Sequence, residues 1–246
     1  MPETRLIFYT KDDLGEMKVH EDGQYRLLSF AKGDEQSRIS LAKPHVLQHE
    51  YSQTMMLSLL FNTPKRLTLL GVGGGCLISC MHAAVAGIHI TGIELRPQVI
   101  HIAKTYFNMP SSKRISIIEQ DAKAYIADFT HKKVDLLFTD LYHAHGMDKG
   151  VLREKFIENC DRQLKPNGWL VINCWEEEYN YLDLVELLRT YFIDIRSVNT
   201  GAGNWVIFAG KLMDHQNAKQ LKQEAQKLSN TLGFPLTKWL NRLESL

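Results

Sequence analysis

The sequence predicts an α/β fold built on a mostly parallel sheet. Between residues 66 and 210, apolar runs alternate with amphipathic stretches, which is the pattern of successive βα units. The last two apolar runs are joined only by residues 199–204, too few for a crossover helix, so they predict an antiparallel pair at the sheet edge. A turn made almost entirely of glycine, at residues 71–75, follows the first run. Together these observations predict a seven-stranded, mostly parallel sheet with an antiparallel terminal hairpin.

The seven expected strands follow the apolar runs. They lie at residues 67–70, 88–93, 115–118, 134–138, 169–172, 193–198 and 205–209. The amphipathic stretches between them predict helices that cover both faces of the sheet.

Two further segments flank this core. Short β-type runs at residues 17–20, 25–30 and 37–41, separated by turn formers, predict a small N-terminal β subdomain at residues 1–45. A helix is expected over 46–60, at the start of a nucleotide-binding domain spanning 46–212. Residues 213–246 have helical periodicity interrupted at 233–235, which predicts a tail of two helices.

Composition limits the partners. The 246 residues include 29 basic and 28 acidic side chains, and this balance gives no reason to expect binding to nucleic acid or to an anionic membrane. The four cysteines form no Cys-x-x-Cys pair, which is typical of reduced, buried thiols. No stretch approaches the ~18 apolar residues of a membrane span, and no targeting segment is evident. We therefore expect a cytoplasmic protein that acts on small molecules.

The glycine turn predicts a nucleotide site. Gly71, Gly73 and Gly75 allow a ligand to approach the backbone closely, and a helix beginning near Gly75 would direct its positive dipole end at that ligand. In the dinucleotide fingerprint Gly-x-Gly-x-x-Gly, the third glycine would fall on Cys76. This departure disfavours a nicotinamide dinucleotide.

Acidic residues follow three of the predicted strands. Glu94 ends the second strand, where a carboxylate can accept hydrogen bonds from ribose hydroxyls; the alternative is an ion pair with Arg96. Asp121 and Ala122 follow the third strand and are placed to contact an adenine, although Asp121 is also a suitable helix N-cap. Asp140 ends the fourth strand, at the edge where ligands bind in sheets of this kind.

Together, these residues resemble the spermidine synthase (polyamine aminopropyltransferase) family over roughly residues 15–210. The resemblance implies the Rossmann-like fold of class I S-adenosylmethionine-dependent methyltransferases. It also implies that S-adenosylmethionine or its decarboxylated form is the co-substrate, that a small amine is the acceptor, and that the chain forms a homodimer. Tyr51 falls near the family's substrate-contacting tyrosine, and Gln36 resembles a family glutamine near the substrate. Core packing for Tyr51 and a turn role for Gln36 are the alternatives.

Two departures from the family concern its carboxylates. The family's glycine turn reads Gly-Gly-Gly-Asp-Gly-Gly, and Gly74 stands where that aspartate would hold the amine of the nucleotide tail. The family's Asp-Ser-Ser-Asp is replaced by Asp140-Leu-Tyr-His143, so His143 takes the place of the aspartate that accepts a proton. A neutral histidine could still act as a base near pH 7.

These departures leave three hypotheses open. Asp140, His143 and Tyr51 could serve the transfer of an aminopropyl or related alkyl group to a small amine. Methyl transfer from S-adenosylmethionine to a small molecule is the second hypothesis, which the missing aspartate favours. A nucleotide-binding protein without activity is the third. The histidines and the aspartate within residues 143–148 do not form a convincing ligand set, and we expect no metal.

Overall fold

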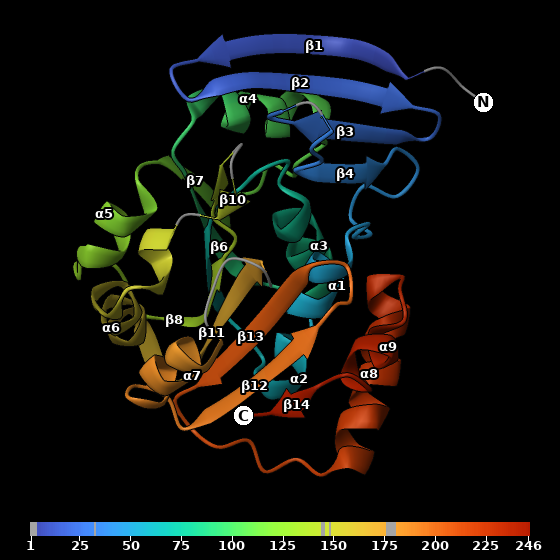
Figure 1. Cartoon of the computed structure of the whole chain (residues 1–246). Helices are drawn as coiled ribbons and strands as arrows, with labels where there is room; N and C mark the ends of the chain where they lie inside the picture. The colour runs from blue at the N-terminus through green and yellow to red at the C-terminus, as the bar shows by residue number, and fades with distance from the viewer. Residues whose placement is uncertain (1–3, 32, 144–145, 148, 176–180) are drawn as a thin grey trace.

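The computed structural model describes residues 4–31, 33–143, 146–147, 149–175 and 181–246, and it describes residues 143, 147, 149, 151 and 181 by their backbone alone. A large central sheet carries helices on both faces, and a smaller antiparallel sheet lies across one end of it (Figure 1). The α/β architecture predicted from the alternating runs is therefore confirmed.

In the described part of the chain, the central sheet contains the seven expected strands and a short eighth one. They are β5 (Arg66–Leu70), β6 (His89–Glu94), β7 (Ile115–Glu119), β8 (Val134–Thr139), β11 (Leu164–Trp175), β12 (Asp194–Asn199), β13 (Asn204–Gly210) and β14 (Glu244–Ser245). Their order across the sheet is β14-β12-β13-β11-β8-β5-β6-β7. β5, β6, β7, β8 and β11 pair with one another in parallel, whereas β13 is antiparallel to both β11 and β12.

The eighth strand comes from the last residues of the chain. Ser245 of β14 pairs with Arg196 of β12, and the amide of Leu246 donates to the carbonyl of Ile195 at 2.8 Å. A strand of two residues has no periodicity of its own, so only the fold reveals it.

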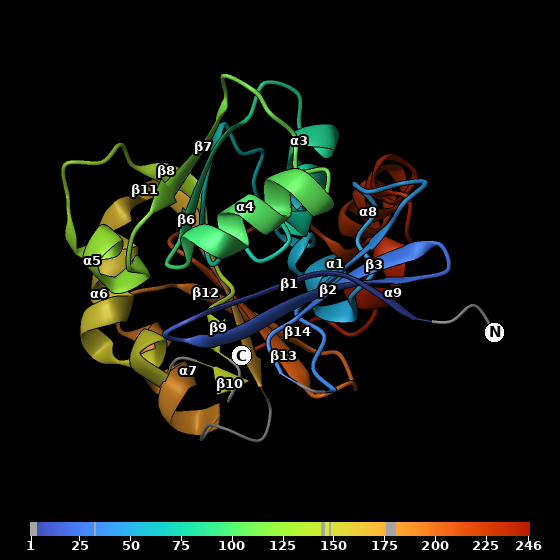
Figure 2. The ribbon, with the colours of Figure 1, turned by 90° about the horizontal axis from the view of Figure 1, so that it is seen from above.

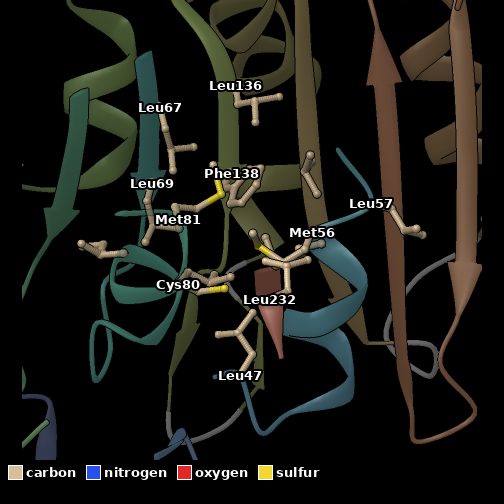
Figure 3. Close-up of a cluster of buried hydrophobic side chains, with 14 of the residues drawn as sticks. Leu47, Met56, Leu57, Leu67, Leu69, Cys80, Met81, Leu136, Phe138 and Leu232 are labelled. Carbon is tan, nitrogen blue, oxygen red and sulfur yellow. The ribbon is translucent and has the colours of Figure 1, made fainter. Parts of the chain in front are cut away.

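Helices cover both faces of the sheet. They are α1 (Glu50–Met55), α2 (Ser58–Phe61), α3 (Cys76–Ala84), α4 (Pro97–Tyr106), α5 (Ala122–Ala127), α6 (Glu154–Gln163), α7 (Tyr181–Arg189), α8 (Ala218–Leu232) and α9 (Leu236–Leu240). Alternate strand residues face opposite layers: Leu136 and Phe138 of β8 pack with α1, α3 and α8, whereas Leu137 packs with α5, α6 and α7. Figure 3 shows the first of these layers, where Met56, Met81 and Leu232 gather around the strand residues.

The helix expected over residues 46–60 is shorter and is divided in two. It begins at Glu50 and breaks at Met56, because the amides of Met56 and Leu57 bond to carbonyls three residues back instead of four. Met56 and Leu57 are both fully buried at this break. Their burial shows that packing, rather than helical periodicity, determines the chain path there.

The N-terminal sheet has four strands where three were expected. They are β1 (Arg5–Asp12), β2 (Gly15–Asp22), β3 (Tyr25–Ser29) and β4 (Ser37–Ser40), in that order. β1 forms a hairpin with β2, and Gly15 provides the positive φ of +119° at the turn. The sheet lies over α4, with Met17, Val19 and Leu28 packed against helix residues such as Ile102 (Figure 2).

The two predicted terminal helices are present. α8 begins with a capping box between Asn217 and Gln220 and ends at Gly233, where φ is +80°. α9 follows and buries Trp239 beneath α1. A small hairpin, β9 (Tyr142–His143) with β10 (Gly146–Met147), and a 3₁₀ turn at Lys149–Leu152 follow β8. None of the helices formed by the described residues is long and apolar enough to span a bilayer.

Candidate active site

A cavity of about 860 Å³ lies at the carboxyl ends of the parallel strands, beneath the N-terminal sheet. Open parallel sheets bind ligands at this edge. Eight of the ten predicted site residues line the cavity: Gln36, Tyr51, Gly71, Gly73, Glu94, Asp121, Ala122 and Asp140. Gly75 lies outside the lining, and the side chain of His143 lies outside the described part of the structure. The fold therefore brings together residues that are more than 100 positions apart in the sequence.

The glycine turn is built by positive φ angles and close packing. Gly71 has a φ of +87°, and a Cβ atom there would lie 2.1 Å from the backbone oxygen of Asp140. No other residue type fits between these two segments. Gly73, with a φ of +53°, exposes its backbone to the cavity.

Gly75 has a structural role in this turn. It is the N-cap of α3 with a φ of +75°, and a Cβ atom there would lie 2.7 Å from the sulfur of Met109. Gly75 was predicted to lie at the ligand, but it does not line the cavity. The residue instead lets the helix start where its first amides face the turn.

Glu94 is held by the glycine turn. Its Oε2 accepts hydrogen bonds from the amides of Val72, at 3.0 Å, and Gly73, at 3.4 Å, and its Oε1 accepts from the amide of Arg96 at 3.0 Å. The Arg96 guanidinium does not form the alternative ion pair, because it binds both carboxylate oxygens of Asp12 at 2.8 and 2.9 Å. The Glu94 carboxylate is thus fixed at the cavity wall without a side-chain cation.

Asp121 caps α5 and lines the cavity at the same time. One carboxylate oxygen accepts from the amide of Ala124 at 2.9 Å, which is the N-cap role that the sequence left open. Ala122 begins the helix beside it and lines the cavity too. The cap fixes the aspartate, and its second carboxylate oxygen has room for another donor.

Asp140 forms the half-buried centre of the site. Tyr51 Oη donates to its Oδ2 at 3.3 Å, and Asn173 Nδ2 donates to its Oδ1 at 2.9 Å. Burial raises the pKa of Asp140 above its ordinary value, although these two hydrogen bonds oppose the shift. Burial and the neighbouring Asp140 carboxylate raise the pKa of Tyr51 well above its ordinary value, so Tyr51 remains a neutral donor.

Sequence reasoning missed Asn173 and its partner. Asn173, on β11, also accepts a hydrogen bond from Asn204 Nδ2 on β13, at 3.0 Å. This chain of amides orients the Asp140 carboxylate from the antiparallel side of the sheet. The position of an asparagine at the end of the fifth strand was the available signal, because that edge faces the ligand.

Gln36 and Cys76 line the cavity, but neither side chain is placed to react. Both oxygens of Asp34 accept hydrogen bonds from Gln36 Nε2, at 2.8 and 2.9 Å, so Gln36 has the turn role left open in the sequence while it also lines the cavity. Burial raises the pKa of Cys76 to about 12, which leaves a neutral thiol rather than a nucleophile. Among the residues that the structure describes, no three His, Cys, Asp or Glu side chains are grouped to hold a metal.

The chain is similar in sequence to known proteins. A family model described as a methyltransferase domain matches residues 69–172. A polyamine aminopropyltransferase from Neisseria meningitidis is 30% identical over 98% of this chain and 94% of its own length. The chain belongs to the polyamine aminopropyltransferase family. Another member, from Chromobacterium violaceum, is 26% identical over 99% of this chain and 95% of its own length.

Solved structures show the same fold. A probable spermidine synthase from Corynebacterium glutamicum gives a TM-score of 0.76 at 19% identity and covers 96% of this chain and 90% of its own. A spermidine synthase in complex with the transition state analogue AdoDATO gives 0.69 at 18% identity, with 97% and 83% covered. Human methyltransferase-like protein 13 in complex with SAH gives 0.66 at 21% identity, with 76% and 94% covered. The chain therefore has the fold that these spermidine synthases and this methyltransferase share.

The structure explains why this member of the aminopropyltransferase family has glycine at position 74. A Cβ atom there would lie 2.7 Å from Phe107 Cδ1 and 2.8 Å from the Cβ of Ser37, and the Gly74 amide donates to Ser37 Oγ at 2.8 Å. The space that the family's aspartate would need is filled by packing between the turn, β4 and the end of α4. The N-terminal sheet packs so closely on the turn that position 74 has no room for a carboxylate side chain.

Proposed function

We propose that this chain transfers an aminopropyl group from decarboxylated S-adenosylmethionine to a small primary amine. The observation that carries the proposal is that one cavity joins two carboxylate sites, Glu94 with Asp121 on one side and the half-buried Asp140 with Tyr51 on the other. The near full-length likeness to polyamine aminopropyltransferases supports this choice.

The first side of the cavity suits an adenosyl group. Ribose hydroxyls would donate to Glu94, and the adenine amino group would donate to Asp121 while the amide of Ala122 donates to the ring. The backbone of Gly71 and Gly73 would lie along the thioether. A volume of about 860 Å³ is within the usual range for a cofactor with a small second substrate.

The second side suits a cationic amine. Ionised Asp140 would supply the negative charge, and Tyr142 and Trp175, with ring centroids 5.5 Å apart, line the cavity with aromatic faces. The amine nitrogen would attack the carbon beside the sulfonium, so the protein's main contribution would be to align nucleophile and electrophile. Gln36 at the rim would contact the substrate only if it released Asp34.

Product analysis tests the proposal. The purified protein is incubated with decarboxylated S-adenosylmethionine and a linear diamine such as putrescine, and mass spectrometry follows both products. We expect methylthioadenosine and an amine that has gained one aminopropyl group, and at limiting nucleotide we expect both to fall sharply in Glu94→Ala. A persistent absence of transfer would instead support a nucleotide-binding protein without activity.

Methyl transfer from S-adenosylmethionine is the second candidate, and Gly74 favours it. An aspartate at that position would repel the carboxylate of intact S-adenosylmethionine, and the packing by Phe107 and Ser37 leaves only backbone there. Calorimetric titration with both nucleotides separates the candidates. Preference for the decarboxylated form would eliminate methyl transfer.

The proposal includes a cytoplasmic homodimer that binds neither nucleic acid nor membrane. The half-exposed side chains of Leu6 and Tyr9 on edge strand β1 support a contact between copies through the N-terminal sheet. Light scattering coupled to size-exclusion chromatography tests it: a monomeric mass, unchanged on concentration, would contradict the dimer.

A further inference from the structure

A histidine–carboxylate pair lies in the cavity wall beside Tyr51. His49 Nε2 is 2.7 Å from Glu35 Oε1, and Arg38 Nη2 is 2.9 Å from the other oxygen of Glu35. His49 is the residue before α1, but its side chain makes no capping hydrogen bond to that helix. The ring turns instead toward the loop between β3 and β4, and the histidine side chain is 20% exposed.

This pair is next to Tyr51 and Asp140, at the centre of the site. The rings of His49 and Tyr51 have centroids 5.5 Å apart, and Tyr51 donates to Asp140. His49, Glu35, Tyr51 and Asp140 all line the same cavity. An amine bound at Asp140 would therefore also be near the imidazole.

The hydrogen bonds of the site leave one ring nitrogen of His49 available to accept a proton. Both carboxylate oxygens of Asp140 already accept a hydrogen bond, one from Asn173 and one from Tyr51. A carboxylate can only accept, so the Glu35 contact requires hydrogen on Nε2 of His49. The neutral ring then has a lone pair on Nδ1, for which the described residues offer no hydrogen-bond donor.

We propose that His49, held by Glu35, is the base that removes the proton from the attacking amine. The inference rests on the aminopropyl transfer proposed above. The ammonium of the acceptor gives one proton to Nδ1 of His49. The neutral amine then uses its lone pair to form a bond to the carbon beside the sulfonium, the C–S bond breaks, and its electron pair returns to sulfur as a neutral thioether. The imidazolium releases the proton to solvent.

The surrounding charges favour this step. Glu35 contacts His49, and the Asp140 carboxylate lines the same cavity. Arg38 is already engaged with Glu35, and Glu50 is paired with Lys238 at 2.5 Å. The imidazolium formed during the reaction would thus face net negative charge. Glu35 would stabilise it directly, as carboxylates do for catalytic histidines.

The chain offers a matched control. His131 also pairs with a carboxylate, Asp128 at 3.4 Å, and it stacks on Tyr125 at 4.2 Å. His131 and its two partners are absent from the cavity lining. Substituting His131 therefore removes a similar pair without touching the proposed site.

The test compares His49→Gln, Glu35→Gln and His131→Gln with the unmodified protein, using decarboxylated S-adenosylmethionine and putrescine. We expect His49→Gln to lower kcat about a hundredfold or more with little change in KM, and to remove an acid limb from the profile of kcat/KM against pH. Because Glu35→Gln removes a charge that stabilises imidazolium, we expect that limb to move to lower pH. His131→Gln should keep full activity. Added imidazole should restore turnover to His49→Ala, a result that a structural role would not give.

The failures are distinguishable. If the unmodified protein makes no aminopropylated product, the proposed function falls and the base assignment falls with it. If the unmodified protein is active while His49→Gln keeps its kcat and its acid limb, only the assignment of His49 is overturned. If His49→Gln does not fold, an unshifted acid limb in Glu35→Gln overturns the assignment by itself.

Discussion

Tyr51 Oη donates a hydrogen bond to Asp140 Oδ2 at 3.3 Å, and this contact ties the start of α1 to the end of β8, 89 residues later in the chain. It places a neutral phenol against a half-buried carboxylate that an amine would have to approach. Removing the charge of Asp140 is therefore a direct test of how the site works.

Asp140→Asn should abolish turnover while changing nucleotide affinity little, because the adenosyl contacts lie at Glu94 and Asp121. We expect kcat to fall about a hundredfold or more, in the range found when a group acting in the transition state is removed. Calorimetry with the nucleotide measures the affinity, and product analysis measures the turnover. Preserved turnover would remove Asp140 from the mechanism.

The same variant should unfold at a higher temperature near neutral pH. Since burial raises the pKa of Asp140, the folded state holds its proton more tightly than the unfolded state, and stability decreases as pH rises through that raised pKa. Asparagine removes this cost, so the gain in stability should be largest at neutral pH and vanish below the ordinary aspartate pKa. Thermal unfolding across pH measures the difference, and a loss of stability at neutral pH would count against a destabilising charge at Asp140.

Glu94→Ala should weaken binding of the adenosyl nucleotide by about 10- to 100-fold, because hydrogen bonds to a charged group contribute about 1.5–3 kcal/mol. Glu119→Ala is the matched control: Glu119 pairs with Glu94 in the register of β6 and β7 but does not line the cavity. Equal affinities in the two variants would contradict the ribose role of Glu94.

Gly71→Ala should destabilise the fold by at least about 2 kcal/mol, because the substitution adds both left-handed strain and overlap with the Asp140 backbone. Gly87→Ala separates the two causes. Its φ is +77°, yet a Cβ atom there meets nothing within 4 Å, so only the strain is added. Urea unfolding compares the two variants. Equal losses of unfolding free energy would show that the glycine turn moves to accommodate the added atom.

Gly74→Asp should not recreate the family's amine-binding aspartate. Phe107 and Ser37 occupy the space, so we expect a loss of about 1–3 kcal/mol in unfolding free energy and no tighter binding of decarboxylated S-adenosylmethionine. Chemical denaturation and calorimetry test the two expectations. Tighter binding in this variant would show that the turn can open to admit the side chain.

Much of the fold follows from local pattern. A parallel strand such as β8 is buried on both faces and therefore appears as a continuous apolar run. Apolar runs made all seven major strands recognisable. β1 was missed although its apolar run and Gly15 formed a hairpin signal. The division of the helix at Met56 had no such signal, because it depends on how Met56 and Leu57 pack into the core of the folded protein.

Site residues were predictable where they end or follow a strand, and less so elsewhere. Glu94, Asp121 and Asp140 each end or follow a parallel strand, and topology alone brings such positions together. Asn173 lies near the end of β11 but was not predicted as a site residue, because an amide carries no charge. His49 and Glu35 belong to loops whose approach depends on how the N-terminal sheet is seated, and no spacing in the sequence encodes that contact.

One measurement addresses the central claim most directly: mass spectrometry of the products formed when the protein receives an amine together with both S-adenosylmethionine and its decarboxylated form. Aminopropyl transfer predicts methylthioadenosine and an amine extended by one aminopropyl group, with intact S-adenosylmethionine unused. A methylated amine with S-adenosylhomocysteine, and no aminopropylated product, would contradict it.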